Sequence, residues 1–273
     1  RASVRLMLAS WSFSGAGLMG GYYLGVWERL LRSDVPSRLF CAHRSRFLGA
    51  SAGSLIAAAI ASGARQPDVA SAFERIVARV REAAPVRGAL GCDLLSFVRP
   101  EVETILPEDA HERCSGRVTV ALVDRTQFVW RPVRRSSFAS RSELISALMT
   151  SAYIPFVTSS SHPESNSELA LMMDGGLLDN WPREPDPLQT IIVSPFGGSF
   201  DISPTSQLRS SSTPSRIPVA PGIWADADLA NLYRLLQACR PADDMQAHDS
   251  LIRSGYVDCD AFLRQRGFVP VTR

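Results

Sequence analysis

Short apolar runs alternate with amphipathic segments along most of the chain. Residues 4–12, 46–49 and 190–193 are apolar runs of the kind that form buried strands. Residues 22–31 follow the first run, and their large apolar side chains recur at helical spacing. Strands that alternate with helices predict βαβ units, and therefore an α/β fold with a mainly parallel central sheet covered by helices on both faces.

Further elements follow from the same patterns. The other helices expected are residues 54–62, 68–83, 141–151, 229–238 and 245–254. The other strands expected are residues 118–123 and 127–133, joined by a turn at Asp124 and Arg125, and residues 169–173. Residues 199–222 are rich in serine, proline and arginine, which is typical of a loop or linker.

The composition is that of an ordinary globular chain, and it argues against several kinds of site. Of the 273 residues, 45% are hydrophobic, and the formal net charge of +2 is too small to indicate binding of nucleic acid. Five cysteines are scattered without a C-x-x-C pair. We therefore expect neither a disulfide framework nor a zinc site, and a reducing compartment is the simpler interpretation.

The charged and apolar residues also bear on membranes. All 29 basic residues are arginine, which reflects either genome composition or contacts with phosphate and carboxylate groups at a lipid surface. The longest apolar stretch, residues 54–64, is too short to span a bilayer of about 30 Å. No secretory signal is evident at the start of the sequence, so the expected location is cytoplasmic.

Residues 49–53 read Gly-Ala-Ser-Ala-Gly and fit the G-x-S-x-G pattern of a nucleophilic serine. The motif lies between a predicted strand and a predicted helix. A nucleophile on such a strained turn needs small neighbours, and all four neighbours of Ser51 are glycine or alanine. The amides of the following helix would favour negative charge at Ser51. The pattern predicts a nucleophile at Ser51, with a tight packing turn as the alternative.

A glycine-rich loop precedes this motif and has two alternative uses. Its residues, which fit G-x-G-x-x-G, are Gly15, Ala16, Gly17, Leu18, Met19 and Gly20. In a dinucleotide-binding fold, the second strand would end in a carboxylate that binds ribose. Here the second strand ends at Ser51 instead. This favours the other use, an oxyanion hole whose backbone amides stabilise a tetrahedral intermediate.

Asp174 is the candidate base that would take the proton of Ser51. It follows the predicted strand at residues 169–173 and precedes two glycines, which let the backbone turn away from the site. An ordinary Asp-Gly turn is the alternative interpretation.

A histidine is the usual base for a serine nucleophile, but the histidines here are without a surrounding motif. They are His43, His111, His162 and His248. The chain order Ser–Asp–His of α/β-hydrolases would select His248. Its polar, helical surroundings predict a surface residue instead, so we expect no histidine in the site.

In this order, the glycine-rich loop, the Ser51 turn and the D-G-G motif at Asp174 resemble the patatin-like phospholipase family, in particular its adipose triglyceride lipase and adiponutrin branch. Similar stretches span nearly the whole chain, at residues 12–17, 49–55, 106–112, 153–155, 174–180, 193–196 and 231–235. The resemblance implies a three-layer α/β domain. Its expected parts are a patatin-like catalytic domain at residues 1–198, a loop or linker at 199–222, and helices at 223–273 packed on the same domain.

The resemblance also implies an activity. Members of this family use a Ser–Asp dyad, so Ser51 would be the nucleophile, Asp174 the general base, and the loop from Gly15 to Gly20 the oxyanion hole. The implied reaction is hydrolysis of acyl esters, chiefly triacylglycerol or phospholipid, without a metal or other cofactor. The implied partners are the lipid ester, a lipid-droplet or membrane surface contacted peripherally, and a protein co-activator.

Three classes of function stay open at this point. The first is an active lipid acyl hydrolase, whose acyl-enzyme could also pass its acyl group to an alcohol, as in an acyltransferase or transacylase. The second is a catalytically weak protein of the same fold that binds lipid or regulates other proteins. The third is an oxidoreductase that binds a nucleotide at the glycine-rich loop.

Overall fold

A central sheet organises the computed structural model, which describes residues 9–164, 167–186, 190–204, 216–220, 223–226, 229–240 and 245–270. The strands of this sheet are β1 (Ser10–Phe13), β2 (Phe47–Gly49), β3 (Val118–Asp124), β4 (Arg131–Arg135), β5 (Met172–Asp174) and β6 (Thr190–Val193). The order is β4-β3-β2-β1-β6, and β5 also pairs with β3. Strands β1, β2, β3 and β6 are parallel, whereas β4 and β5 are antiparallel to β3. The expectation of an α/β fold with a mainly parallel sheet is confirmed.

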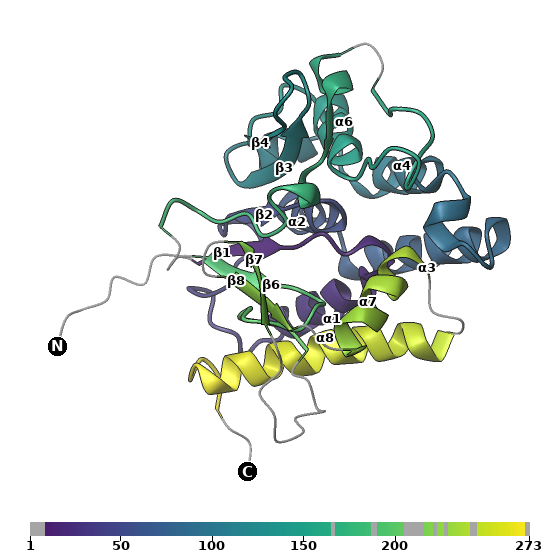
Figure 1. The fold of residues 1–273 in the computed structure, drawn as a ribbon. Helices are drawn as coiled ribbons and strands as arrows, with labels where there is room; N and C mark the ends of the chain where they lie inside the picture. The colour runs from purple at the N-terminus through teal and green to yellow at the C-terminus, as the bar shows by residue number, and fades with distance from the viewer. Residues whose placement is uncertain are drawn as a thin grey trace.

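Helices flank this sheet (Figure 1). The α-helices are α1 (Gly21–Leu30), α2 (Ala52–Ser62), α3 (Gln66–Ala83), α4 (Leu94–Ile105), α5 (Ala110–Cys114), α6 (Arg141–Ser151), α7 (Leu229–Cys239) and α8 (Met245–Gln265). The 3-10 helices are η1 (Gly17–Met19), η2 (Gly88–Gly91), η3 (Glu168–Leu171) and η4 (Gly175–Leu177). Helix α2 contacts β1, β2 and β3, and α6 contacts β3 and β5. None of the described helices is long and apolar enough to cross a membrane.

A core of aromatic side chains fixes the central strands. Every residue of β1 and β2 is buried, as expected for parallel strands covered on both faces. The ring of Trp11 packs edge-on against that of Phe40, and the ring of Phe13 against that of Tyr23 in α1, with centroids 5.5 and 5.4 Å apart. This packing holds the carboxyl ends of β1 and β2, from which the candidate site is built.

Helices α1 and α8 run side by side at very short range (Figure 1). A Cβ atom at Gly25 would lie 1.8 Å from the carbonyl oxygen of Ile252, so only glycine allows this approach. The buried guanidinium of Arg29 donates to Asp34 and to Asp260 of α8, at 2.9 and 2.7 Å. Close backbone contact and a paired buried charge together hold the C-terminal helix on the domain.

Three expected strands differ in detail. The strand expected at residues 127–133 is observed as β4, which begins only at Arg131 and ends at Arg135. The strand expected at residues 169–173 is helix η3 followed by β5, because the Ser167 hydroxyl accepts a hydrogen bond from the Leu169 amide at 3.2 Å and starts a turn. The strand expected at residues 4–12 is observed as β1, and residues 1–8 lie outside the described residues.

The segments after the sheet differ more. The expected loop at residues 199–222 contains strand β7 (Arg216–Ala220), which pairs with β8 (Ile223–Asp226) in a small second sheet. Residues 205–215 and 221–222 of that loop lie outside the described residues. Helix α8 continues to Gln265, well beyond the expected end at residue 254. The division of the chain at residues 198 and 222 stays a prediction.

The contact between α1 and α8 gives a test of stability. We expect Gly25→Val to lower the free energy of unfolding by about 3 kcal/mol, because the new side chain must push the two backbones apart. Thermal unfolding followed by circular dichroism measures the change. Ala78→Val is the matched control, since residue 78 is exposed on α3. Equal losses in the two variants would contradict this account of the helix pair.

Candidate active site

The candidate site lies at the carboxyl ends of β1 and β2, where the loops that follow the two strands meet. Parallel pairing places Phe13 opposite Gly49, so both chains leave the sheet at the same edge. A Cβ atom at Gly15 would lie 3.3 Å from the Cβ atom of Ser51. The structure therefore brings together the glycine-rich loop and the serine turn.

The backbone at Ser51 is strained. Its φ of 53° and ψ of −130° lie where residues other than glycine are rare. The turn fits because the residues two positions away on either side have no side chain: a Cβ atom at Gly49 would lie 2.4 Å from the Gly53 oxygen, and one at Gly53 would lie 2.1 Å from the Phe13 oxygen. The Ser51 amide donates to the hydroxyl of Ser151 at 3.0 Å. This is the geometry of a serine exposed between a strand and a helix.

Asp174 is buried and faces Ser51. Its carboxyl accepts a hydrogen bond from the Gly176 amide at 2.7 Å. Burial raises the pKa of Asp174 to about 6, and the Ser51 hydroxyl and the Gly176 amide oppose the rise because they stabilise the charged form. The Asp174 amide donates to the Tyr153 carbonyl at 2.9 Å, which fixes the end of β5. The position of the carboxyl and its raised pKa are therefore those that a proton acceptor for Ser51 would need.

Some backbone amides of the glycine-rich loop donate hydrogen bonds within the protein, and others do not. The Gly15 amide donates to the side-chain oxygen of Asn180 at 2.8 Å, and the Met19 amide donates to the Ala16 carbonyl at 3.0 Å. The amides of Ala16, Gly17 and Leu18 donate to no acceptor among the described residues. These amides are therefore the candidates to receive an oxyanion.

Asn180 is a site residue that the sequence patterns do not predict. Its side-chain oxygen accepts from the Gly15 amide, and a Cβ atom at Gly176 would lie 2.9 Å from the same oxygen. Asn180 thus ties the loop after β1 to the turn that carries Asp174. The sequence feature that could have pointed to Asn180 is a polar side chain a few residues beyond the D-G-G motif.

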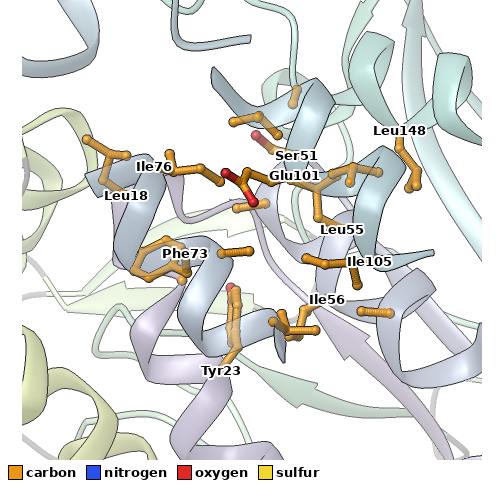
Figure 2. Close-up of a pocket in the computed structure, with 18 of the residues that line it drawn as sticks. Leu18, Tyr23, Ser51, Leu55, Ile56, Phe73, Ile76, Glu101, Ile105 and Leu148 are labelled. Atoms are coloured by element: carbon orange, nitrogen blue, oxygen red, sulfur yellow. The ribbon is translucent and has the colours of Figure 1, made fainter. Parts of the chain in front are cut away.

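A cavity of about 130 Å³ opens beside Ser51 (Figure 2). Its walls come from the glycine-rich loop and from helices α1, α2, α3, α4 and α6. The lining is almost entirely apolar, with Leu18, Leu55, Phe73, Ile76 and Leu148 among its side chains. A cavity of this character suits a hydrocarbon chain whose polar end lies at Ser51.

The histidines take no part in this geometry. His248 was expected at the surface, and this expectation is wrong: its ring is buried, stacks on Phe73 at 5.4 Å between centroids, and has its pKa lowered by burial. The helix α8 that carries it packs on α1, which the local pattern of polar residues does not reveal. The ring of His162 bonds the backbone of Met172 and Glu164. No hydrogen bond among the described residues joins a histidine to Ser51.

No group of three or more histidine, cysteine, aspartate or glutamate side chains within the described ranges could hold a metal ion. The residues that do converge are the serine, the carboxyl and the two glycine-bearing turns.

Comparison with known families decides which proteins share this arrangement. A model described as patatin-like phospholipase matches residues 12–186, a range that includes the glycine-rich loop, Ser51 and Asp174. The chain belongs to the patatin-like phospholipase family. The resemblance seen in its motifs is therefore confirmed.

Several patatin-like relatives are similar over nearly the whole chain. Human patatin-like phospholipase domain-containing protein 2 is 32% identical over 260 residues, which cover 94% of this chain and 49% of that protein. Human 1-acylglycerol-3-phosphate O-acyltransferase PNPLA3 is 30% identical, with 94% and 51% covered. Human patatin-like phospholipase domain-containing protein 4 is 29% identical, with 92% and 95% covered. The chain spans about half the length of the first two.

A solved structure supports the patatin-like fold. VipD from Legionella pneumophila superposes with a TM-score of 0.56 and 11% identity, covering 94% of this chain and 67% of VipD. At this identity the match concerns the fold alone. Members of the patatin-like family carry out lipid acyl hydrolysis or acyl transfer.

The environment of Asp174 gives a test that needs no substrate. We expect its carboxyl to titrate near pH 6 in the folded protein, and its pKa to rise further in Ser51→Ala, which removes a hydrogen bond to the charged form. Carbon NMR of protein labelled at aspartate carboxyls measures both values, with Asp174→Asn to assign the signal. A titration near the ordinary value of 3.8 would contradict the burial of this group.

The same raised pKa has a consequence for stability. Because the folded state holds the proton of Asp174 more tightly than the unfolded state, this group stabilises the fold at low pH and loses that effect as pH rises through about 6. Asp174→Asn should therefore unfold at a higher temperature than the parent above pH 6, with the gain absent at pH 3.8 and below.

Proposed function

We propose that the chain is a serine acyl hydrolase that cleaves lipid esters through a dyad of Ser51 and Asp174. The supporting observation is the strained serine, which lies beside a buried carboxyl and lines an apolar cavity. Serine without a partner is a weak nucleophile, and an adjacent base activates it. The proposal needs no metal and no nucleotide.

The reaction proceeds by two acyl transfers. The Ser51 hydroxyl oxygen attacks the ester carbonyl carbon while its proton passes to the Asp174 carboxylate. The alcohol then leaves with that proton, and the acyl group stays on Ser51 as an ester. Water attacks this acyl-enzyme, gives its proton to Asp174, and the fatty acid departs as the proton returns to Ser51. An Asp174 pKa of about 6 suits this work, because the group is charged at neutral pH yet more basic than an exposed aspartate.

The glycine-rich loop is the proposed oxyanion hole. Each transfer passes through a tetrahedral intermediate with negative charge on the former carbonyl oxygen. Backbone amides aimed at this oxygen stabilise it, and each is worth about 3 kcal/mol of barrier in well-studied cases. Of the loop from Gly15 to Gly20, the amides of Ala16, Gly17 and Leu18 support this role, since they donate to no acceptor among the described residues.

The proposed substrates are triacylglycerol or phospholipid, with acyl transfer to an alcohol as a second candidate activity. The names of two relatives support the second candidate: an O-acyltransferase, PNPLA3, and the human omega-hydroxyceramide transacylase, which is 29% identical over 265 residues. Water and an alcohol compete for the same acyl-enzyme, so one site serves both reactions. A protein co-activator belongs to the same proposal and awaits its own test.

Substitution of the dyad tests the proposal. We expect Ser51→Ala and Asp174→Asn each to lower kcat for long-chain esters by about 10⁴-fold or more, because either change removes a group that acts with the other. His248→Ala should keep its activity per folded molecule. Fatty acid release from triacylglycerol and phosphatidylcholine measures hydrolysis, and added monoacylglycerol measures transfer.

A fluorophosphonate probe provides the control. Labelling of the parent that disappears in Ser51→Ala supports a reactive serine. Folded parent protein that takes no label would favour a catalytically weak lipid-binding protein. Loss of activity in His248→Ala alone would overturn the dyad.

We also propose that the loop between β3 and β4 contacts a lipid surface, either a membrane or a lipid droplet. Three consecutive large apolar residues, Phe128, Val129 and Trp130, are exposed at its tip, and Phe128 is fully exposed. Exposed apolar patches mark interaction sites, and tryptophan favours the membrane interface. The exposed Arg131 beside them would meet anionic head groups.

The position of this loop supports a lipid surface rather than another partner. Strand β3 pairs with β5 so that Leu122 lies opposite Asp174 and Asp124 opposite Met172. The loop therefore leaves the sheet only a few residues from the candidate base. Contact at this edge would bring the site close to its lipid substrate.

Surface substitutions test this contact without disturbing the core. We expect Trp130→Ser combined with Phe128→Ser to weaken binding to phosphatidylcholine–phosphatidylserine vesicles by about tenfold or more, since each side chain loses apolar burial in the interface. Flotation with the vesicles measures binding. Leu31→Ser is the matched control, because Leu31 is 55% exposed and Trp130 is 50% exposed. Unchanged flotation, or an equal loss in the control, would contradict this surface.

A further inference from the structure

Glu101 is the one charged side chain among the described residues that line the cavity beside Ser51. It comes from α4, whose cavity face carries Val98, Val102 and Ile105 at helical spacing. The helical spacing predicts an apolar residue at position 101. The observed residue instead places a carboxylate in the wall of a cavity suited to hydrocarbon.

Two arginines of α3 balance this charge from the solvent side. The guanidinium of Arg75 donates to both carboxylate oxygens of Glu101, at 3.1 and 3.2 Å from Nε and 2.7 Å from Nη2. Arg79 lies 3.9 Å away. Both arginine side chains are about half exposed, while that of Glu101 is only 8% exposed. The cations thus stay at the surface and the carboxylate lies inside.

A purely structural role does not account for this placement. An ion pair that only joins α3 to α4 works at the surface, where neither group loses its water. Removing a carboxylate from water costs several kcal/mol, and two half-exposed guanidinium groups offset only part of that cost. A carboxylate on the outer face of α4, where the side chain of Glu103 is 47% exposed, would join the two helices without this desolvation cost.

The carboxylate retains capacity to accept a further hydrogen bond. Two oxygens offer about four acceptor positions, and the three contacts with Arg75 leave capacity on Oε1. Figure 2 shows Glu101 pointing into the cavity, among Leu18, Leu55 and Ile76 and on the side where Ser51 lies. A group that only accepts favours a ligand that donates, and the donor that lipids carry in otherwise apolar parts is a hydroxyl.

We propose that Glu101 accepts a hydrogen bond from a lipid hydroxyl, and that it makes the site selective for hydroxyl-bearing substrates. The inference rests on the proposed function at Ser51 and names the substrate class for that site. Two sources supply the same chemistry: a hydroxyl on the acyl chain, or the free glycerol hydroxyl of a mono- or diacylglycerol. A site that bonds a substrate hydroxyl discriminates strongly against the analogue without it, because the polar group of the protein is then left unpaired.

Paired substrates test the proposal with the purified full chain. One pair is a hydroxylated long-chain acyl ester and its plain counterpart of equal length. The other is a monoacylglycerol and the same lipid with methyl-capped hydroxyls. We expect kcat/KM for the hydroxyl-bearing member to be about tenfold or more higher in one pair, and the pair that shows this identifies the source. Glu101→Leu should bring that ratio close to one, and Glu103→Leu on the exposed face of α4 should leave it unchanged.

Two further measurements keep the test decisive. If Glu101→Leu fails to fold, Glu101→Gln keeps the shape, loses the charge, and should lower the ratio severalfold. Calorimetric binding of non-hydrolysable ether analogues of both pairs to Ser51→Ala gives the ratio without turnover, so absence of hydrolysis would count against the proposed function alone. Equal rates and equal binding within both pairs in the parent, or a preference that persists in Glu101→Leu, would overturn the role of Glu101.

Discussion

The strained turn at Ser51 is the constraint on which the site depends. A residue with φ of 53° and a side chain costs about 1–3 kcal/mol relative to an ordinary conformation. The surrounding packing supplies that energy: Gly49 and Gly53 let three backbone segments come together, and Ser151 holds the Ser51 amide. Any side chain at either glycine would collide with backbone rather than with a flexible neighbour. The serine is exposed to the cavity because the core leaves it no other conformation.

Two buried carboxyls near this turn, those of Asp174 and Glu101, have different kinds of hydrogen-bond partner. Asp174 receives only a hydroxyl and an amide, so burial raises its pKa to about 6. Glu101 instead receives the guanidinium of Arg75. The first arrangement keeps a carboxyl ready to take a proton, and the second pairs a carboxylate in the cavity wall with a cation at the surface. The difference lies in the second partner, a neutral amide in one case and a cation in the other.

Local sequence patterns predicted the helices, strands and motifs whose own residues show a clear hydrophobic or glycine pattern. The buried strands β2 and β6, the helices α1, α2 and α6, and the order of the serine and D-G-G motifs all follow from apolar runs and small residues. Helix α4 was missed because Pro100 and Glu101 interrupt its apolar face, although this helix forms a wall of the cavity. Asn180 and the burial of His248 were also missed, since both depend on contacts between segments far apart in the chain.

The cavity and the proposed base impose the same physical requirement. A carboxyl holds a raised pKa only while water stays away, and the cavity beside Ser51 is lined by hydrocarbon side chains from α2, α3 and α4. A long acyl chain in that cavity would exclude water further and strengthen the interaction between the serine hydroxyl and its base. A short, polar ester would leave water in the same space and weaken it. The proposed preference for lipid esters and the raised pKa of Asp174 therefore have one cause, the apolar surroundings of the site.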